Sequence, residues 1–211
     1  MITFLQKHLR KPGRGIIVLL FAASLWQLAT AGWIQGKALL AQQLLNHSWE
    51  KAANDTTKYN PPAVHRPWPW ADTWPVAKLL VPRYHIEQIV LAGDSGSSLA
   101  FGPAHALASA RPGTSGTSMI SGHRDTHFSF LQQLKLNDTV LIQSADKTIS
   151  YRVNDFKIVD SSSYRLPLDS EHNVLVLVTC YPFNGISDST QRYLVYATEQ
   201  QLEINGAEIK L

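Results

Sequence analysis

The first long apolar stretch of the chain runs over residues 15–34 (GIIVLLFAASLWQLATAGWI), twenty residues without a charge. Its polar interruptions are few, namely Ser24, Gln27 and Thr30. A helix of this length spans about 30 Å, which is the hydrocarbon thickness of a bilayer. The pattern therefore predicts a transmembrane helix that contacts the lipid bilayer through residues 15–34.

The flanks of this stretch predict its orientation. Residues 1–14 hold four basic and no acidic side chains, and only Lys37 follows soon after the apolar stretch. This asymmetry places the N-terminus in the cytoplasm and residues from 35 onward outside the inner (plasma) membrane, in the periplasm. A cleaved signal peptide, with Ala29-Thr30-Ala31 as its processing site, is the alternative. The length of the stretch favours an uncleaved single-pass anchor, because the apolar core of a signal peptide has about 7 to 15 residues.

Residues 35–75 divide into two parts of different composition. Over residues 36–53 no Gly or Pro interrupts the sequence after Gly36, and Leu40, Leu44, Leu45 and Trp49 recur near one helical face, so we expect a helical stalk. Residues 54–75 then hold five prolines and three tryptophans, which exclude a regular helix or central strand. We expect an extended strap that covers part of the following domain, with an aromatic binding surface as the alternative.

From residue 76 to residue 211 the pattern changes to short strands separated by turns. No long helical pattern intervenes, so we expect a mostly antiparallel β domain, with a barrel preferred to a sandwich. The predicted strands cover residues 86–91, 117–121, 139–143, 148–159, 174–179 and 192–197, with a weaker one at 202–209.

Composition narrows the class of protein. Hydrophobic residues make up 45% of the 211 residues and charged residues 17%, which excludes a disordered chain, and a single cysteine excludes a disulfide scaffold. The net charge of +3 comes from the N-terminus, because residues 15–211 carry 15 basic and 16 acidic side chains. The body therefore has no basic surface for nucleic acid, and we expect no nucleic-acid partner.

Three chemically active residues lie next to predicted strands. The apolar run VLVLVT (174–179) predicts a strand buried on both faces that ends at Cys180. If the following strand is its hairpin neighbour, Arg192 lies at the same rim, and His123 follows the strand that ends at Ser121. A thiol, an imidazole and a guanidinium suit acyl transfer, in which they supply nucleophile, proton donor and oxyanion stabiliser. The alternative is that Cys180 is an inert buried residue.

The residues around these three resemble the sortases, a family of membrane-anchored cysteine transpeptidases. Residues 176–180 (VLVTC) resemble the family motif T-L-x-T-C, with Val176 in place of the first Thr, which we expect to affect packing alone. Residues 121–128 (SGHRDTHF) resemble the histidine segment, 102–105 (GPAH) a preceding stretch of class D-like members, and 192–195 (RYLV) the arginine strand. Together with the Trp-Pro segment and the N-terminus, they resemble the sortases of Gram-negative bacteria most.

The resemblance implies a closed eight-stranded β-barrel with short helices, preceded by the transmembrane helix. It implies that Cys180 is the nucleophile, His123 the general acid/base and Arg192 the group that positions substrate and stabilises the oxyanion. It also implies that His105, Thr126 and Thr179 line the substrate pocket. The implied reaction cleaves an LPxTG-like C-terminal sorting signal of a substrate protein after its Thr, through a thioacyl-enzyme. An amine acceptor on the cell envelope then takes the protein.

Other interpretations remain open. The thioacyl intermediate could pass to water, as in a cysteine peptidase, or the domain could be a non-catalytic, membrane-tethered binding module. His127 lies four residues after His123, but no third ligand is fixed by the spacing, so we expect neither a metal nor a cofactor. Arg124 competes with Arg192 for the catalytic role, and we expect it instead to form an ion pair with Asp125 or Asp138.

Overall fold

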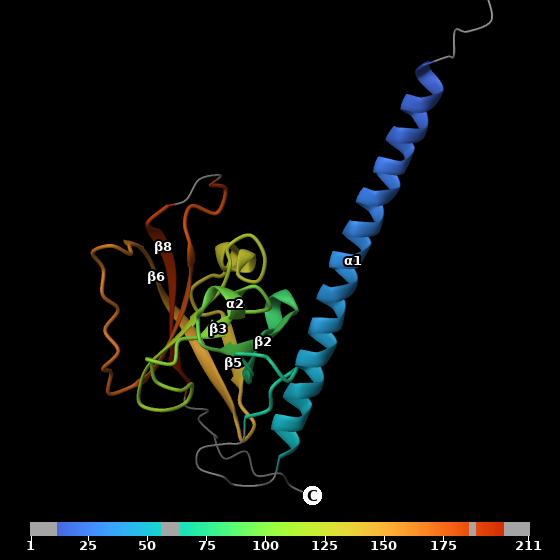
Figure 1. Cartoon of the computed structure of the whole chain (residues 1–211). Helices are drawn as coiled ribbons and strands as arrows, with labels where there is room; N and C mark the ends of the chain where they lie inside the picture. Colours follow the sequence, from blue (N-terminus) through green and yellow to red (C-terminus); the bar gives the residue numbers. More distant parts are fainter. Residues whose placement is uncertain (1–11, 56–63, 186–188, 201–211) are drawn as a thin grey trace, which may run out of the picture. The chain divides into compact units, whose positions relative to one another are not determined.

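The computed structural model describes residues 12–55, 64–185 and 189–200 (Figure 1). The chain divides after Gln42 into two compact units. The first unit contains the larger part of the N-terminal helix, and the second contains the last turns of that helix together with every described strand. The weak strand expected at 202–209 lies outside the described residues.

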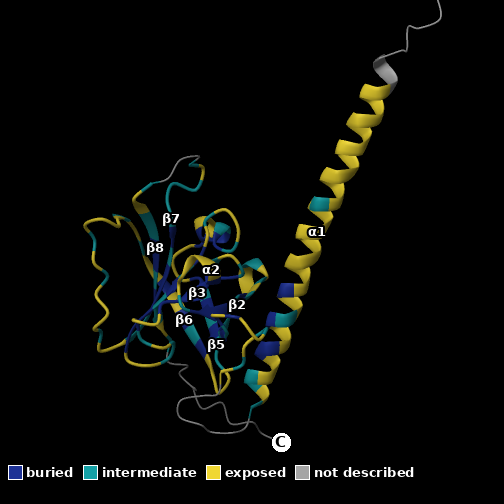
Figure 2. Cartoon of the chain, in the orientation of Figure 1, coloured by how far each residue is buried: buried dark blue, intermediate teal, exposed yellow. Residues whose placement is uncertain are grey.

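Helix α1 (Pro12–Asn54) joins the predicted membrane helix and the predicted stalk into one element of 43 residues. Its side chains from residue 15 to residue 40 are exposed, with only Thr30 half-buried (Figure 2). The Ser24 hydroxyl donates to Leu20 O and the Thr30 hydroxyl to Gln27 O, so these polar groups are satisfied within the helix. Among the described residues this is the one helix long and apolar enough to cross a membrane, a property that a signal sequence shares.

Eight strands close into a barrel in the order β1-β2-β3-β4-β7-β8-β6-β5. Neighbouring strands are antiparallel except for β2·β3 and β4·β7, which are parallel. The prediction of a closed, mostly antiparallel eight-stranded barrel is therefore confirmed, although the sequence pattern missed β1 and β3. The strands are β1 (Pro75–Val81), β2 (Ile86–Ala92), β3 (Ala104–His105), β4 (Gly116–Ser121), β5 (Thr139–Gln143), β6 (Thr148–Asp160), β7 (Asn173–Cys180) and β8 (Gln191–Glu199). In the described part of the chain, three short helices connect them: η1 (Pro82–Tyr84), α2 (Gly96–Leu99) and η2 (Ser129–Gln133).

The barrel interior is filled by aliphatic and aromatic side chains from all strands except β3. Leu79, Ile142 and Leu177 are fully buried there, and each such side chain stabilises the fold by about 1.5–3 kcal/mol. Because side chains alternate along a strand, Leu175 and Leu177 of β7 point inward while Val176 and Val178 point to the outer face. The same alternation sends Cys180 outward.

A second, smaller cluster covers the outer face of β2 and β3. Leu45 and Trp49, from the last turns of α1, pack there with Ile89, Leu91 and Ala104. The final turns of the expected stalk thus belong to the core of the second unit. The strap also packs on this unit, because Trp68 contacts Phe101 edge-on, with ring centroids 5.2 Å apart, and the Ala92 N–H donates to Trp74 O.

Candidate functional site

Cys180 and Arg192 lie opposite each other on two neighbouring strands. Strand β7 ends at Cys180, and in its antiparallel pairing with β8 the partner of Cys180 is Arg192. Opposed residues in such a pair have Cβ atoms about 4.5–5.5 Å apart and share one face of the sheet. The hairpin arrangement predicted for this pair is therefore present.

His123 reaches the same place from the other side of β7. Strands β4 and β7 are parallel, with Ser121 opposite Val178. The pairing continues past the end of β4, because the Gly122 N–H donates to Val178 O at 3.0 Å and the Thr179 hydroxyl donates to Gly122 O at 2.7 Å. One further step in this register places His123 level with Cys180. His123 is exposed and Cys180 is half-buried, so both are open to solvent.

The outer face beside Cys180 is partly covered by the segment between β6 and β7. Tyr164 of this segment shares a hydrogen bond of 2.8 Å with Tyr196 of β8, whose partner on β7 is Val176. Burial and this hydrogen bond raise the pKa of Tyr196. Val176 is fully buried beneath this cover on the face that carries Cys180, so the position where the sequence departs from the motif is a packing position.

The Arg192 guanidinium contacts the loop that precedes β8. Its Nη1 donates to Ser189 O at 2.6 Å and to Gln191 O at 2.9 Å. A guanidinium has five N–H donors, and within residues 12–55, 64–185 and 189–200 those on Nε and Nη2 make no hydrogen bond, so they can serve a further acceptor. Arg192 therefore has the capacity to bind an additional oxygen at the Cys180 end of the hairpin.

Asp160, at the end of β6, joins the two segments that flank this face. Its carboxylate accepts hydrogen bonds from the Ser162 N–H and hydroxyl and from the Thr190 hydroxyl. These bonds, with a smaller effect of the nearby Arg192 charge, lower the pKa of Asp160. Asp160 thus connects the start of the β6–β7 segment to the end of the β7–β8 segment.

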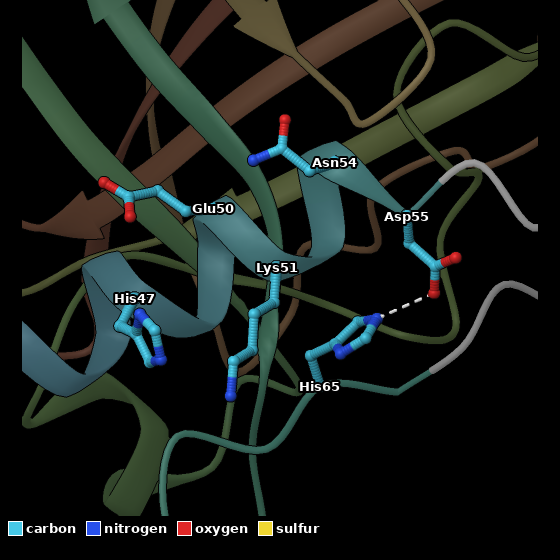
Figure 3. A pocket seen from close by; sticks show the side chains of 6 residues that line it. All are labelled: His47, Glu50, Lys51, Asn54, Asp55 and His65. Carbon is cyan, nitrogen blue, oxygen red and sulfur yellow. Dashed lines mark hydrogen bonds and ion pairs between the residues drawn. The ribbon is translucent and has the colours of Figure 1, made fainter.

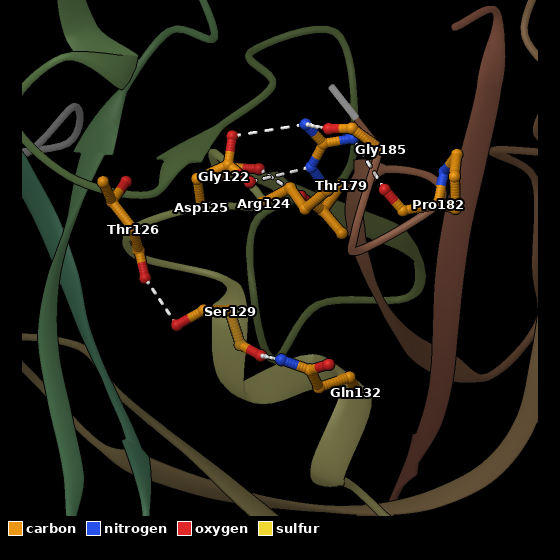
Figure 4. A network of polar contacts seen from close by, with 9 residues as sticks. All are labelled: Gly122, Arg124, Asp125, Thr126, Ser129, Gln132, Thr179, Pro182 and Gly185. Atoms are coloured by element: carbon orange, nitrogen blue, oxygen red, sulfur yellow. Dashed lines mark hydrogen bonds and ion pairs between the residues drawn. The ribbon is translucent and has the colours of Figure 1, made fainter. Parts of the chain in front are cut away.

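Arg124 forms the expected ion pair with Asp125, at 2.9 Å from Nε to Oδ1. The hydrogen bond from Arg124 lowers the pKa of Asp125. The other predicted partner, Asp138, pairs with Arg83 at 2.6 Å. Arg124 also donates to two backbone carbonyls of the segment that follows Cys180, which the sequence did not predict (Figure 4).

Aromatic side chains pack behind the ends of β7 and β8. Tyr181 and Tyr193 are stacked, with centroids 6.2 Å apart and planes at 20°, and the Phe183 ring lies 5.2 Å from that of Tyr193. Each tyrosine directly follows one residue of the Cys180–Arg192 pair. These contacts hold the backbone of the pair from the opposite face of the ribbon.

The three residues expected in the pocket have different surroundings. His105 is buried, and its Nε2 donates to Ala110 O at 2.9 Å, while burial lowers its pKa. Thr126 is exposed, and its carbonyl accepts from the Ser129 hydroxyl. Thr179 is buried next to Cys180, with its hydroxyl donated to Gly122 O. Of the three, Thr179 is the one next to Cys180 in the chain. Its hydroxyl bonds to the carbonyl of Gly122, the residue directly before His123.

His127 is half-buried, and burial together with the His123 charge lowers its pKa. Its carbonyl accepts from the Gln88 amide at 2.8 Å. Over residues 12–55, 64–185 and 189–200, no group of three or more His, Cys, Asp or Glu side chains is arranged to hold a metal ion.

Two hollows lie elsewhere on the second unit. One, of about 410 Å³, contains the His65–Asp55 ion pair of 3.0 Å, with His47 and Lys51 beside it (Figure 3). The other, of about 640 Å³, adjoins Gly116 at the start of β4, whereas Cys180 lies at the far end of the neighbouring strand β7. Neither lining includes Cys180, His123 or Arg192.

Comparisons with known proteins agree with this fold. The family model described as the Sortase domain matches residues 79–200. Sortase D of Bacillus subtilis (strain 168) is 30% identical over 119 residues, which are 56% of this chain and 60% of that protein. The fold is similar to that of a Clostridium perfringens sortase D5 transpeptidase, with a TM-score of 0.63 and 18% identity over 77% of this chain and 99% of the other. It is also similar to a C. perfringens sortase C with the C-terminal cell wall sorting motif, with a TM-score of 0.56 and 22% identity over 79% of this chain and 91% of the other.

The match covers the whole arrangement described above, from the histidine segment to the arginine strand, and it extends over more than half of the chain. With its closed eight-stranded barrel and this match over residues 79–200, the chain belongs to the sortase family.

Proposed function

We propose that this protein is a cysteine transpeptidase in which Cys180 is the nucleophile, His123 the general acid/base and Arg192 the oxyanion-stabilising group. The observation that carries the proposal is the register of three neighbouring strands, β4, β7 and β8. Cys180 is the direct partner of Arg192, and the β4·β7 pairing continued past Gly122 brings His123 level with Cys180. Three reactive groups from three strands at one rim match the requirements of acyl transfer.

The chemistry follows from these roles. The Cys180 sulfur, as thiolate, attacks the carbonyl carbon of the scissile peptide bond, and a C–S bond forms. Arg192 donates hydrogen bonds to the resulting oxyanion, for which a guanidinium is suited because it does not lose its proton. His123 gives a proton to the departing amine as the C–N bond breaks. An incoming amine then attacks the thioester and transfers its proton to His123, and the thiolate is released.

We infer that the substrate is a protein with an LPxTG-like C-terminal sorting signal, cleaved after its Thr and transferred to an amine acceptor on the cell envelope. The similar C. perfringens sortase C has a structure with the C-terminal cell wall sorting motif. This supports the same class of substrate for the present chain. His105, Thr126 and Thr179 stay the proposed pocket residues, of which Thr126 is exposed and the other two are buried.

We further propose that α1 anchors the enzyme in the inner membrane through residues 15–34, with the barrel in the periplasm. The apolar side chains of this part of the helix are more than half exposed, as for Ile17 at 67% and Trp26 at 72%. Such a surface is stable when lipid covers it. The basic residues before it support a cytoplasmic N-terminus.

A peptide turnover assay tests the catalytic assignment. The full chain in detergent micelles is mixed with an LPxTG-like peptide and a primary amine, and the products are identified by chromatography and mass spectrometry. We expect an amide product from the unmodified chain, none from Cys180→Ala, and a loss of about 10²-fold in Arg192→Lys, because one ammonium cannot replace the planar fork.

Thermal unfolding of each variant serves as the control for folding. Turnover by Cys180→Ala would contradict the assignment of the nucleophile, and full activity of Arg192→Lys would contradict the role of Arg192. Release of only the hydrolysed peptide in the presence of amine would instead indicate a cysteine peptidase.

A further inference from the structure

Arg124 fastens the histidine segment to the segment that follows Cys180. Its Nη1 donates to Pro182 O at 2.6 Å and its Nη2 to Gly185 O at 2.8 Å (Figure 4). Its other edge faces the Asp125 carboxylate, with Nε at 2.9 Å from Oδ1 and Nη2 at 3.3 Å from Oδ2. The Arg124 side chain is only 13% exposed, and its two bonds to the backbone carbonyls are partly buried, so these charge-assisted bonds are stronger than surface ones, whereas the Asp125 carboxylate is exposed.

A second tether lies on the other side of the reactive residues. The Thr179 hydroxyl donates to Gly122 O at 2.7 Å, and the Gly122 N–H donates to Val178 O. Gly122 directly precedes His123, and Thr179 directly precedes Cys180. This second tether therefore joins the two segments just before the reactive pair, and Arg124 joins them just after it.

We propose that Arg124 is a positioning residue, which fixes the separation and mutual orientation of the Cys180 thiol and the His123 imidazole. The proposal rests on the catalytic roles proposed above for those two groups. Arg124 acts through the backbone rather than on substrate, because its donors are directed at Pro182 O, Gly185 O and Asp125. An arginine suits this task because its planar fork reaches two separate carbonyls at once, which a single ammonium does not.

We call the bonds of Arg124 to Pro182 O, Gly185 O and Asp125 the Arg124 clamp. Loss of this clamp changes the geometry of the reacting groups more than the affinity for peptide. A misplacement of about 1 Å in a catalytic group costs on the order of 10²-fold in rate. The guanidinium bonds to two backbone carbonyls and to Asp125, so in this proposal it makes no contact with the peptide. The expected signature is therefore a lower kcat with a nearly constant KM.

The test uses the full chain in detergent micelles and two ways of loosening the clamp. Arg124→Lys removes the fork. Gly185→Ala crowds it from the loop side, since a Cβ at Gly185 would lie 3.1 Å from Arg124 Nη1. Arg83→Lys is the matched control, because Arg83 forms an ion pair of similar length with Asp138, outside the reactive pair. The readouts are kcat and KM for an LPxTG-like peptide, thermal unfolding, and the rate of Cys180 alkylation by iodoacetamide, measured with and without His123→Gln.

We expect Arg124→Lys to lower kcat about tenfold or more with KM changed by less than about twofold, and Gly185→Ala to act in the same direction more weakly. The effect of His123→Gln on the alkylation rate should shrink in the Arg124→Lys background, as coupled residues show in a double-mutant cycle. Arg83→Lys should change none of these quantities.

Three results would overturn the proposal: an unchanged kcat in Arg124→Lys, a rise in KM alone, or an effect of His123→Gln on alkylation that is absent or the same in both backgrounds. An equal loss of activity in Arg83→Lys would indicate general destabilisation and would overturn it as well. If the unmodified chain turns over no peptide while the alkylation coupling is present, the proposed function fails and the positioning role stands.

Discussion

At the scale of single residues, the glycine before His123 determines how that histidine is presented. A Cβ at Gly122 would lie 2.6 Å from Cγ of Phe128, whose ring is fully buried. The Phe128 N–H also donates a hydrogen bond to His123 O at 2.9 Å, which closes a turn after Gly122. The ring and the turn together hold the backbone from Gly122 to His123 against β7.

Gly122→Ala is expected to lower the free energy of unfolding by about 1–3 kcal/mol, because the buried ring must move to admit the methyl group. It should also reduce kcat/KM, because the shift displaces His123. Denaturant unfolding and peptide turnover measure the two effects. Gly96→Ala is the matched control, since a Cβ at Gly96 meets nothing within 4 Å, and equal stability losses in both variants would contradict the account.

His105 makes the stability of the barrel depend on pH. Burial lowers its pKa below the ordinary value of 6.5, so the unfolded chain binds a proton at a higher pH than the folded one. The stability associated with the neutral ring is therefore complete above pH 6.5 and decreases as the pH falls through the window below it.

We expect the midpoint temperature of thermal unfolding to decrease as the pH is lowered from about 7.5 to about 5.5. The decrease should be smaller in His105→Gln, which retains a donor for Ala110 O. The difference between the two proteins removes the contribution of His127, whose pKa is also lowered. A pH dependence that is identical in the two proteins would show that His105 does not titrate in this range.

At the scale of elements, the sequence predicted which strands carry the reactive residues, and the structure supplied their order. The apolar run before Cys180 and the polar loop before Arg192 were sufficient to predict the β7–β8 hairpin. The parallel pairing of β4 with β7 could not be predicted, because strands that pair in parallel are distant in sequence and no local turn fixes their register.

Two strands were missed for physical reasons. Strand β3 has only two residues, Ala104 and His105, which is too short for an alternating pattern. Strand β1 begins at Pro75, directly after the Pro- and Trp-rich strap. The composition of the strap therefore concealed the start of the strand. The clamp of Arg124 was equally hidden, because its partners are backbone carbonyls, which have no sequence signature.

The last turns of α1 pack on the outside of the barrel, in the second hydrophobic cluster over β2 and β3. In a chain that begins at Gln43, Trp49→Ala should lower the free energy of unfolding by about 3–5 kcal/mol, because it empties the cluster over β2 and β3. Denaturant unfolding measures this loss. Asn46→Ala changes an exposed position on the same turns and is the control. A stability equal to that of the unsubstituted chain in Trp49→Ala would mean that these turns are only a tether.

At the scale of the whole molecule, we propose a catalytic barrel on an N-terminal membrane helix. Expressed as the full chain, the protein should remain in the membrane pellet after alkaline extraction and should have the mass of a chain that retains residues 15–34. A shorter, extractable form that begins at Gly32 would indicate cleavage of a signal peptide after Ala31. The barrel chemistry would be unaffected by that outcome.

The central claim, that Cys180 receives the acyl group of a sorting signal, is tested most directly by intact-mass spectrometry. The full chain is incubated with an LPxTG-like peptide without added amine and quenched with acid. We expect a mass increase equal to the acyl part of the peptide, located on Cys180, absent from Cys180→Ala and diminished when a primary amine is added. No adduct on the unmodified chain with any such peptide, or an equal adduct on Cys180→Ala, would contradict the account.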